Sequence, residues 1–243
     1  AVYQGPDISK HNGNVDIKRV RDAGYKRIGI RAGYGKNNTD QKYNQNALAC
    51  VNLGVPVILY WFSYAYTVEM AVKEAEYVVD HAKKYWDKCP IAFDLEYDSV
   101  RYARTKGVNI DKDLATKMAV AFMNRVKEWF EENGVAACVP SNDKRFHQVI
   151  ENGVYGSNWS ERHVAYLCGL GTFGLSKGII TEKGMAGRFM SIIISQEIEP
   201  DERPYTGIYD YCTKCGACIR RCPADAISLE KGKEHAPCDK WNK

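Results

Sequence analysis

The sequence predicts an α/β protein in two parts, and three observations support this. In residues 1–130, short apolar runs alternate with longer stretches of helical periodicity. Such alternation is typical of a parallel sheet with right-handed helical crossovers, either open or closed into a barrel. The alternation ends near residue 130, and residues 131–243 show only short, mixed elements of α+β type. Five of the nine cysteines gather near the end of the chain, between Cys212 and Cys238.

The elements of the first part follow from apolar runs and capping residues. Residues 55–65 are apolar almost throughout, as expected of a strand buried on both faces. Thr67 is a suitable N-cap for the helix that follows, and Gly54 a suitable stop for the helix before. We expect strands at 5–9, 28–30, 55–65 and 89–97, and helices at 15–25, 40–53, 67–86 and 111–132.

Two carboxylates end the predicted strand at 89–97. Asp94 and Glu96 are two residues apart, so in a strand they point to the same face. Because like charges at close range hold one proton more tightly, the pair suits a general acid beside a stabilising carboxylate, as glycoside hydrolysis requires. Two alternatives remain open from spacing alone: the carboxylates leave the core for solvent, or they bind a cation.

Three stretches of the first part resemble the family-25 glycoside hydrolases, lysozymes that cut the muramic acid linkage of peptidoglycan. They are "GPDISKHNGNVDIKRVRDAGYKRIGIRAGYG", "DQKYNQNALACVNLGVPVILYWFSYA" and "PIAFDLEYD", and the resemblance covers roughly residues 3–127. It implies a β/α barrel that binds peptidoglycan, with Glu96 as the acid/base and with Asp7 and Asp94 in the same carboxylate cluster. Three tyrosines would line the sugar groove or simply pack the barrel: Tyr34, Tyr60 and Tyr64. Because the later strands of the family are not found, we expect only a partial parallel β/α barrel in residues 1–130.

The cysteine-rich stretch "YCTKCGACIRRCPADAI" has metal-ligand spacing. Its four cysteines follow the C-x2-C-x2-C-x3-C-P pattern of a bacterial-type [4Fe–4S] site. A zinc site built from the same thiolates is the alternative, but the spacing favours iron–sulfur. The predicted ligands are Cys212, Cys215, Cys218, Cys222 and Cys238.

The second part resembles the C-terminal part of the epoxyqueuosine reductase-like iron–sulfur proteins, over roughly residues 127–243. The resemblance rests on "NWSERHVAYLCGLGTFGLSKGIITEKGMAGRF" and "YCTKCGACIRRCP", with a helix expected at 160–167 and a strand at 190–198. It implies two [4Fe–4S] clusters in a small ferredoxin-like α+β segment, a redox partner, and a cobalamin held by a larger region that is mostly missing here. "GLGTFG" follows a helix rather than a strand, so we reject it as a dinucleotide motif.

The two parts meet inside one expected helix, residues 121–134, with no Gly/Ser/Pro linker. We therefore expect a hybrid of two fragments with domains at 1–130 and 131–243. Three functions stay open: a peptidoglycan muramidase, an iron–sulfur electron-transfer or reductase module, or an inactive hybrid. A cell-wall hydrolase belongs outside the cell and an iron–sulfur reductase inside it, so the location stays undecided. The net charge of +4 indicates no nucleic acid, and the longest apolar run is too short to span a membrane.

Overall fold

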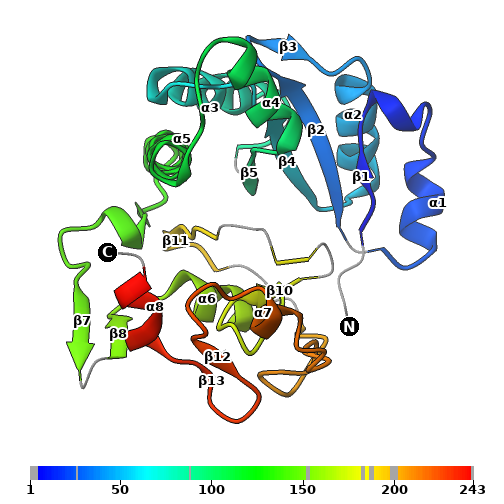
Figure 1. Ribbon diagram of the computed structural model, residues 1–243. Helices are drawn as coiled ribbons and strands as arrows, with labels where there is room; N and C mark the ends of the chain where they lie inside the picture. Colours follow the sequence, from blue (N-terminus) through cyan, green and yellow to red (C-terminus); the bar gives the residue numbers. More distant parts are fainter. Residues whose placement is uncertain are drawn as a thin grey trace. The chain divides into compact units, whose positions relative to one another are not determined.

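The computed structural model describes residues 5–25, 27–87, 89–151, 154–181, 184–185, 189–197 and 202–241 (Figure 1). The chain divides into two compact units. One comprises Tyr3–Val139 with Ile192–Glu197, and we call it the barrel unit. The other comprises Pro140–Ser191 and Ile198–Lys243, with Ala1–Val2, and we call it the cysteine unit.

The barrel unit is built on a mostly parallel sheet of five strands in the order β1-β2-β4-β5, with β3 antiparallel to β2. The register places Asp7 opposite Gly29, and Phe62 opposite Asp94. Parallel strands align their carboxyl ends at one edge, which is where α/β proteins gather their chemistry. The strands are β1 (Asp7–Ile8), β2 (Ile28–Tyr34), β3 (Asn38–Thr39), β4 (Val57–Phe62) and β5 (Ile91–Asp94).

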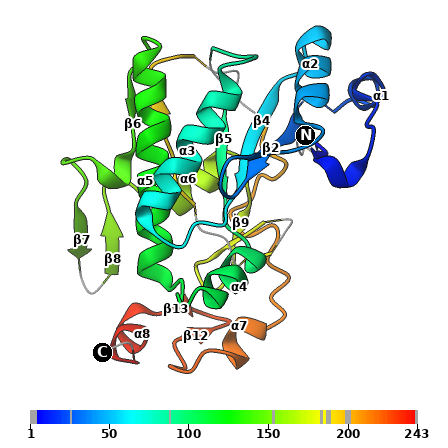
Figure 2. The same ribbon diagram turned by 90° about the horizontal axis from the view of Figure 1, so that it is seen from above.

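Helices follow the strands, and their ends carry the expected caps. Thr67 accepts a hydrogen bond from the Met70 N–H, and Gly54 ends its helix in the left-handed region at φ 64°. The fifth helix packs along the third (Figure 2). The helices are η1 (Lys10–Asn12), α1 (Ile17–Asp22), α2 (Tyr43–Leu53), α3 (Val68–Ala82), α4 (Tyr97–Thr105) and α5 (Lys112–Glu132).

The two faces of the sheet differ in burial. Along β4, Val57, Leu59 and Trp61 are buried, whereas Tyr60 and Phe62 on the opposite face are only half-buried. The buried face packs on the helices in one hydrophobic core. The half-buried face, which we call the inner face, therefore has room for polar side chains and carries the candidate site.

The stretch around Glu96 departs from the expected strand at 89–97. Strand β5 ends at Asp94, and the unexpected helix α4 begins at Tyr97 with Glu96 as its N-cap. Ser99 causes the switch, because its hydroxyl accepts the Glu96 N–H at 3.1 Å and so starts a helix. The backbone of Glu96 is still extended (φ −110°, ψ −177°), but the carboxylate belongs to a helix start rather than to a strand.

Helix α5 runs without interruption through the expected junction near residue 127. The short strand β6 (Ala137–Cys138) then pairs antiparallel with β11 (Ile193–Ile194), which lies within the strand expected at 190–198. This pairing returns a late segment of the chain to the barrel unit.

The cysteine unit combines short helices with two-stranded antiparallel sheets. Its strands pair as β7 with β8, β9 with β10, and β12 with β13. In the part of the chain that the structure describes, every helix is too short or too polar to cross a bilayer. The elements are η2 (Pro140–Asn142), β7 (Gln148–Glu151), β8 (Val154–Ser157), α6 (Glu161–Leu167), β9 (Thr172–Phe173), β10 (Ile179–Ile180), α7 (Ala217–Arg220), β12 (Ile227–Ser228), β13 (Gly232–Lys233) and α8 (His235–Trp241).

Candidate active site

Three carboxylates of the barrel unit are linked electrostatically. Asp94 is half-buried at the end of β5, whereas Asp7 at the start of β1 and Glu96 at the N-cap of α4 are exposed. Burial, together with the negative charges of Glu96 and Asp7, raises the pKa of Asp94 to about 7 against the opposing charge of Arg31. The structure thus brings the three carboxylates that the sequence singled out within electrostatic reach of one another.

Tyr60 connects this cluster across the inner face. It lies on β4 in register with Arg31 of β2 and Ala92 of β5. Burial raises the pKa of the Tyr60 hydroxyl, and so does its hydrogen bond with the Asp7 side chain. A neutral Tyr60 therefore serves as a fixed hydrogen-bonding group between the strands.

Tyr64 lies in an aromatic group just beyond β4. Its ring centroid is 5.2 Å from that of Phe62 and 5.0 Å from that of Tyr102. Tyr102 comes from α4, so the unexpected helix supplies an aromatic side chain that the sequence did not indicate. Half-buried aromatic rings of this kind offer apolar faces on which a sugar ring can stack.

Tyr34 lies at the end of β2, beside two cations. The Lys10 Nζ is 5.5 Å and the Arg31 Cζ 5.6 Å from its ring centroid. Cations at this distance are attracted to the ring face. Tyr34 is thus already in contact with charged groups of the barrel unit, and its ring is half-buried.

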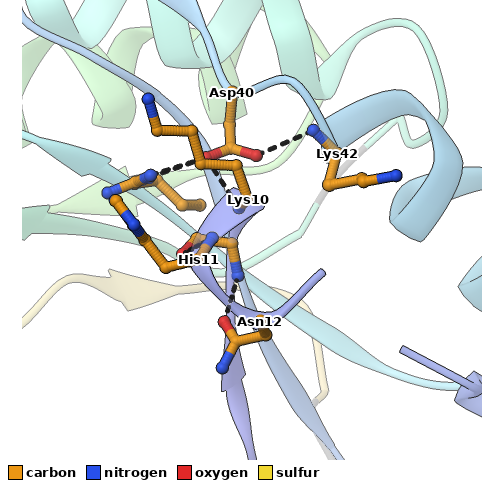
Figure 3. A network of polar contacts seen from close by, with 7 residues as sticks. Lys10, His11, Asn12, Asp40 and Lys42 are labelled. Atoms are coloured by element: carbon orange, nitrogen blue, oxygen red, sulfur yellow. Dashed lines mark hydrogen bonds and ion pairs between the residues drawn. The ribbon is translucent and has the colours of Figure 1, made fainter. Parts of the chain in front are cut away.

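A buried ion pair lies behind these residues (Figure 3). One oxygen of Asp40 accepts hydrogen bonds from the Arg31 Nε at 2.9 Å, the Arg31 Nη2 at 2.7 Å and the Lys10 N–H at 3.1 Å. The other accepts the Lys42 N–H at 2.9 Å. The sequence analysis missed this pair, although an arginine inside the apolar run "IGIRAGY" is a signal for a nearby buried partner.

Glu74 is a second buried carboxylate that the sequence analysis missed. It lies on α3, is 2% exposed, and accepts the Tyr64 N–H at 2.9 Å with one oxygen. Its other oxygen has no hydrogen-bond partner among the described residues. Burial raises the pKa of Glu74 to about 7, although hydrogen bonds from Ser63, Tyr64 and Ala65 oppose the rise.

The cysteine motif occupies a tight loop that leads into α7. Lys214 and Gly216 adopt left-handed backbone conformations at φ 53° and 72°. The N–H of Ala217 lowers the pKa of the Cys215 thiol, with smaller contributions from Thr213 and from the charge of Arg220. Such a lowered pKa favours the thiolate, which is the form that binds metal.

Cys222 has a backbone donor of its own, because its Sγ accepts the Ala226 N–H at 3.3 Å. Among the described residues, however, no three His, Cys, Asp or Glu side chains form a group that could hold a metal ion. The structure describes all five predicted thiols but does not bring them together into such a group. They are Cys212, Cys215, Cys218, Cys222 and Cys238. The motif fits an iron–sulfur cluster through its donor chemistry and its N–H groups directed at sulfur.

Comparison with known families decides the identity of the barrel unit. The sequence model of glycosyl hydrolases family 25 matches residues 6–155. The chain belongs to glycosyl hydrolases family 25. A second model, of the 4Fe-4S binding domain, matches residues 205–228. Both resemblances that motivated the site residues, to family 25 and to a 4Fe-4S protein, are thereby confirmed.

The curated relatives that match the chain include reductive dehalogenases. Tetrachloroethene reductive dehalogenases of Desulfitobacterium hafniense and Dehalobacter restrictus are 36% identical over 69 residues, which is 28% of this family-25 chain and 12% of theirs. The chain thus spans about an eighth of the curated relatives it matches. The narrower kinship with epoxyqueuosine reductase stays a prediction.

Two of the solved structures that are similar to the chain are cell-wall or family-25 enzymes. One is the modular autolysin LytC of Streptococcus pneumoniae, solved with a synthetic peptidoglycan ligand, at 27% identity and a TM-score of 0.44. That match covers 50% of this chain and 29% of LytC. The other is a family 25 glycosyl hydrolase of Bacillus anthracis, at 21% identity and a TM-score of 0.43, covering 54% and 58% of the two chains.

Proposed function

We propose that the barrel unit hydrolyses glycosidic bonds of peptidoglycan as a muramidase, with Glu96 as the acid/base. The observation that carries the proposal is the carboxylate cluster at the end of β5, where the pKa of Asp94 is about 7. Glycoside hydrolysis needs one protonated and one ionised carboxyl group on either side of the scissile bond. The exposed Glu96 beside Asp94 and Asp7 supplies the two kinds of carboxyl group that this reaction needs.

Each side chain of the cluster has a role in this mechanism. Glu96 is exposed at the edge of the sheet, where it donates a proton to the leaving glycosidic oxygen and then takes one from the attacking water. Asp94 and Asp7 stabilise the positive charge that develops on the sugar. Tyr34, Tyr60 and Tyr64 line the groove that holds the sugar.

Substitution of the cluster tests this mechanism. Glu96→Gln removes the proton donor, so we expect clearance of bacterial cell walls to slow by about 10²–10⁴-fold. Asp94→Asn should also be severe, because it removes the charge beside the acid. Asp98→Asn is the matched control: Asp98 is exposed on α4 and forms a surface ion pair with Arg101 at 3.5 Å. Full activity in the Glu96 variant would end the assignment.

A second function is supported by the 4Fe-4S domain match over residues 205–228. We propose that Cys212, Cys215 and Cys218 hold one cluster, with Cys222 or Cys238 as the fourth ligand. Such a cluster supplies one-electron transfer to a redox partner. The N–H groups of Ala217 and Ala226 stabilise the thiolates that the cluster requires. We propose no role for cobalamin, which only family resemblance implies.

Iron content distinguishes these ligands. Replacing Cys212, Cys215 or Cys218 by Ser should remove most of the iron bound after anaerobic reconstitution, because two thiolates do not hold a cubane. An equal loss in either Cys222→Ser or Cys238→Ser would identify the fourth ligand. Cys50→Ser and Cys89→Ser are the controls, since both thiols are buried in the core of the barrel unit. Iron and sulfide are measured per chain together with zinc, and zinc in place of iron would contradict the proposal.

The domain arrangement is also a proposal. We propose a family-25 portion at about 1–130 and a reductase-like, ferredoxin-like portion at about 131–243, joined as a hybrid within α5. The family-25 match continues past this boundary to residue 155. A brown protein that absorbs broadly near about 400 nm supports a working cluster. A colourless protein that clears cell walls supports the hydrolase alone.

A further inference from the structure

The buried Arg31–Asp40 ion pair has no role in the mechanism proposed above. The side chain of Asp40 is 0% exposed and that of Arg31 is 11% exposed. Burying two charges costs much of what their attraction returns, so a buried ion pair is weak evidence for a purely stabilising purpose. Its position suggests a use at the carboxylate cluster instead.

Arg31 faces that cluster from the neighbouring strand. It is in register with Tyr60, whose hydroxyl is hydrogen-bonded to Asp7. The positive charge of Arg31 acts on both Tyr60 and Asp94. The positive charge of Arg31 thus lowers the pKa of Asp94, the candidate catalytic carboxylate.

Asp40 holds this cation and the segment that follows Asp7. Both hydrogen bonds from the guanidinium end on one Asp40 oxygen, which fixes its direction (Figure 3). The same oxygen accepts the N–H of Lys10, three residues after Asp7, and so anchors η1 directly beyond β1. The carboxylate of Asp40 therefore restrains Arg31 and the chain that carries Asp7 at one point.

We propose that the Arg31–Asp40 pair is a positioning unit of the hydrolase site, in which Asp40 aims and partly neutralises the guanidinium whose charge acts on Asp94. This inference rests on the proposed function of the same site. Removing Asp40 alone leaves Arg31 unneutralised, whereas removing both charges takes the cation away from Asp94. The two changes therefore shift the pKa of Asp94 in opposite directions. Loss of packing alone would not produce opposite shifts.

The groups that act on Asp94 come from four elements. They are Asp7 of β1, Arg31 of β2, Tyr60 of β4 and Glu96 at the start of α4. The substitutions below leave Asp7, Tyr60 and Glu96 unchanged. A shift in the Asp94 titration is thus attributable to the charge of the pair.

The test is a carboxyl NMR titration of Asp94, assigned through Asp94→Asn, together with the pH profile of cell-wall clearance. In Asp40→Asn the pKa of Asp94 should fall by about 1 pH unit, because the guanidinium is no longer balanced. In the double variant Arg31→Gln/Asp40→Asn, which keeps hydrogen-bonding side chains at both positions, it should rise above the wild-type value. Asp22→Asn is the control, because Asp22 pairs with Lys18 on the exposed surface of α1.

A pKa of Asp94 that is unchanged in both variants, or that moves the same way in both, would overturn the proposal. The double variant removes the buried unpaired charge, so it keeps the test valid if Asp40→Asn fails to fold. The proposed function fails separately: a wild-type protein that releases no fragments from cell walls would contradict it, while the NMR titration would still decide the role of the pair.

Discussion

At the scale of single residues, burial rather than sequence spacing decides which carboxyl group keeps its proton. Asp94 and Glu74 both have pKa values of about 7, and burial is the first cause for each. Glu96 is exposed at a helix start, where substrate can reach it. The sequence singled out the pair at 94 and 96, which stays a prediction, and it gave no sign of Glu74, since a glutamate inside an amphipathic helix ordinarily faces solvent.

Glu74 gives a prediction about stability. Its pKa is raised from an ordinary 4.5 to about 7, so the folded state binds the proton more tightly than the unfolded state does. The free energy of unfolding should therefore fall as the pH rises from about 4.5 to about 7, and Glu74 should account for about 3 kcal/mol of that fall.

Glu74→Gln should reduce this pH dependence, because the amide does not titrate. Urea unfolding of the wild type and the variant at several pH values measures the difference. Asp94 contributes a fall of the same sign, so part of the slope should remain. Glu76→Gln is the matched control on the same helix, where Glu76 forms a surface ion pair with Lys73. An unchanged slope in Glu74→Gln would contradict the role of burial.

At the scale of elements, apolar patterning predicted the parallel strands and most of the helices of the barrel unit. The runs at 55–65 and 111–132 became β4 and α5 because each buries several large side chains. Helix α4 was not predicted, since "YDSVRYART" has no apolar stripe and buries only Ser99 and Ala103. The Asp40 partner of Arg31 was not predicted either, because the long-range register that joins them is not visible in a local pattern.

Ser99 links α4 to the candidate site, so its substitution tests whether the start of this helix supports Glu96. Its buried hydroxyl accepts the Glu96 N–H, so Ser99→Ala should leave that donor unpaired and loosen the catalytic carboxylate. We expect about 1 kcal/mol less stability and a clear loss of kcat in cell-wall clearance. Thr105→Ala, at the exposed far end of α4, is the control. Wild-type kcat in Ser99→Ala would show that Glu96 needs no such support.

At the scale of the whole molecule, two family models match one chain. The family-25 match and the 4Fe-4S match occupy residues 6–155 and 205–228 and do not overlap. Cysteine spacing predicted the second site as a ligand set. The described thiols do not form a ligand group as the sequence predicts, and such a site forms around its metal and sulfide as well as from the chain. The two proposed functions can therefore be measured separately: iron content tests the cysteine unit, and cell-wall hydrolysis tests the barrel unit.

The central claim is that the carboxylate cluster of the barrel unit cuts the muramic acid linkage. The most direct measurement is analysis of the soluble fragments released from purified peptidoglycan, after borohydride reduction of their new ends. The account predicts reduced muramic acid at these ends with the wild type and Asp98→Asn, and almost none with Glu96→Gln. Reduced glucosamine ends, or equal release by Glu96→Gln, would contradict it.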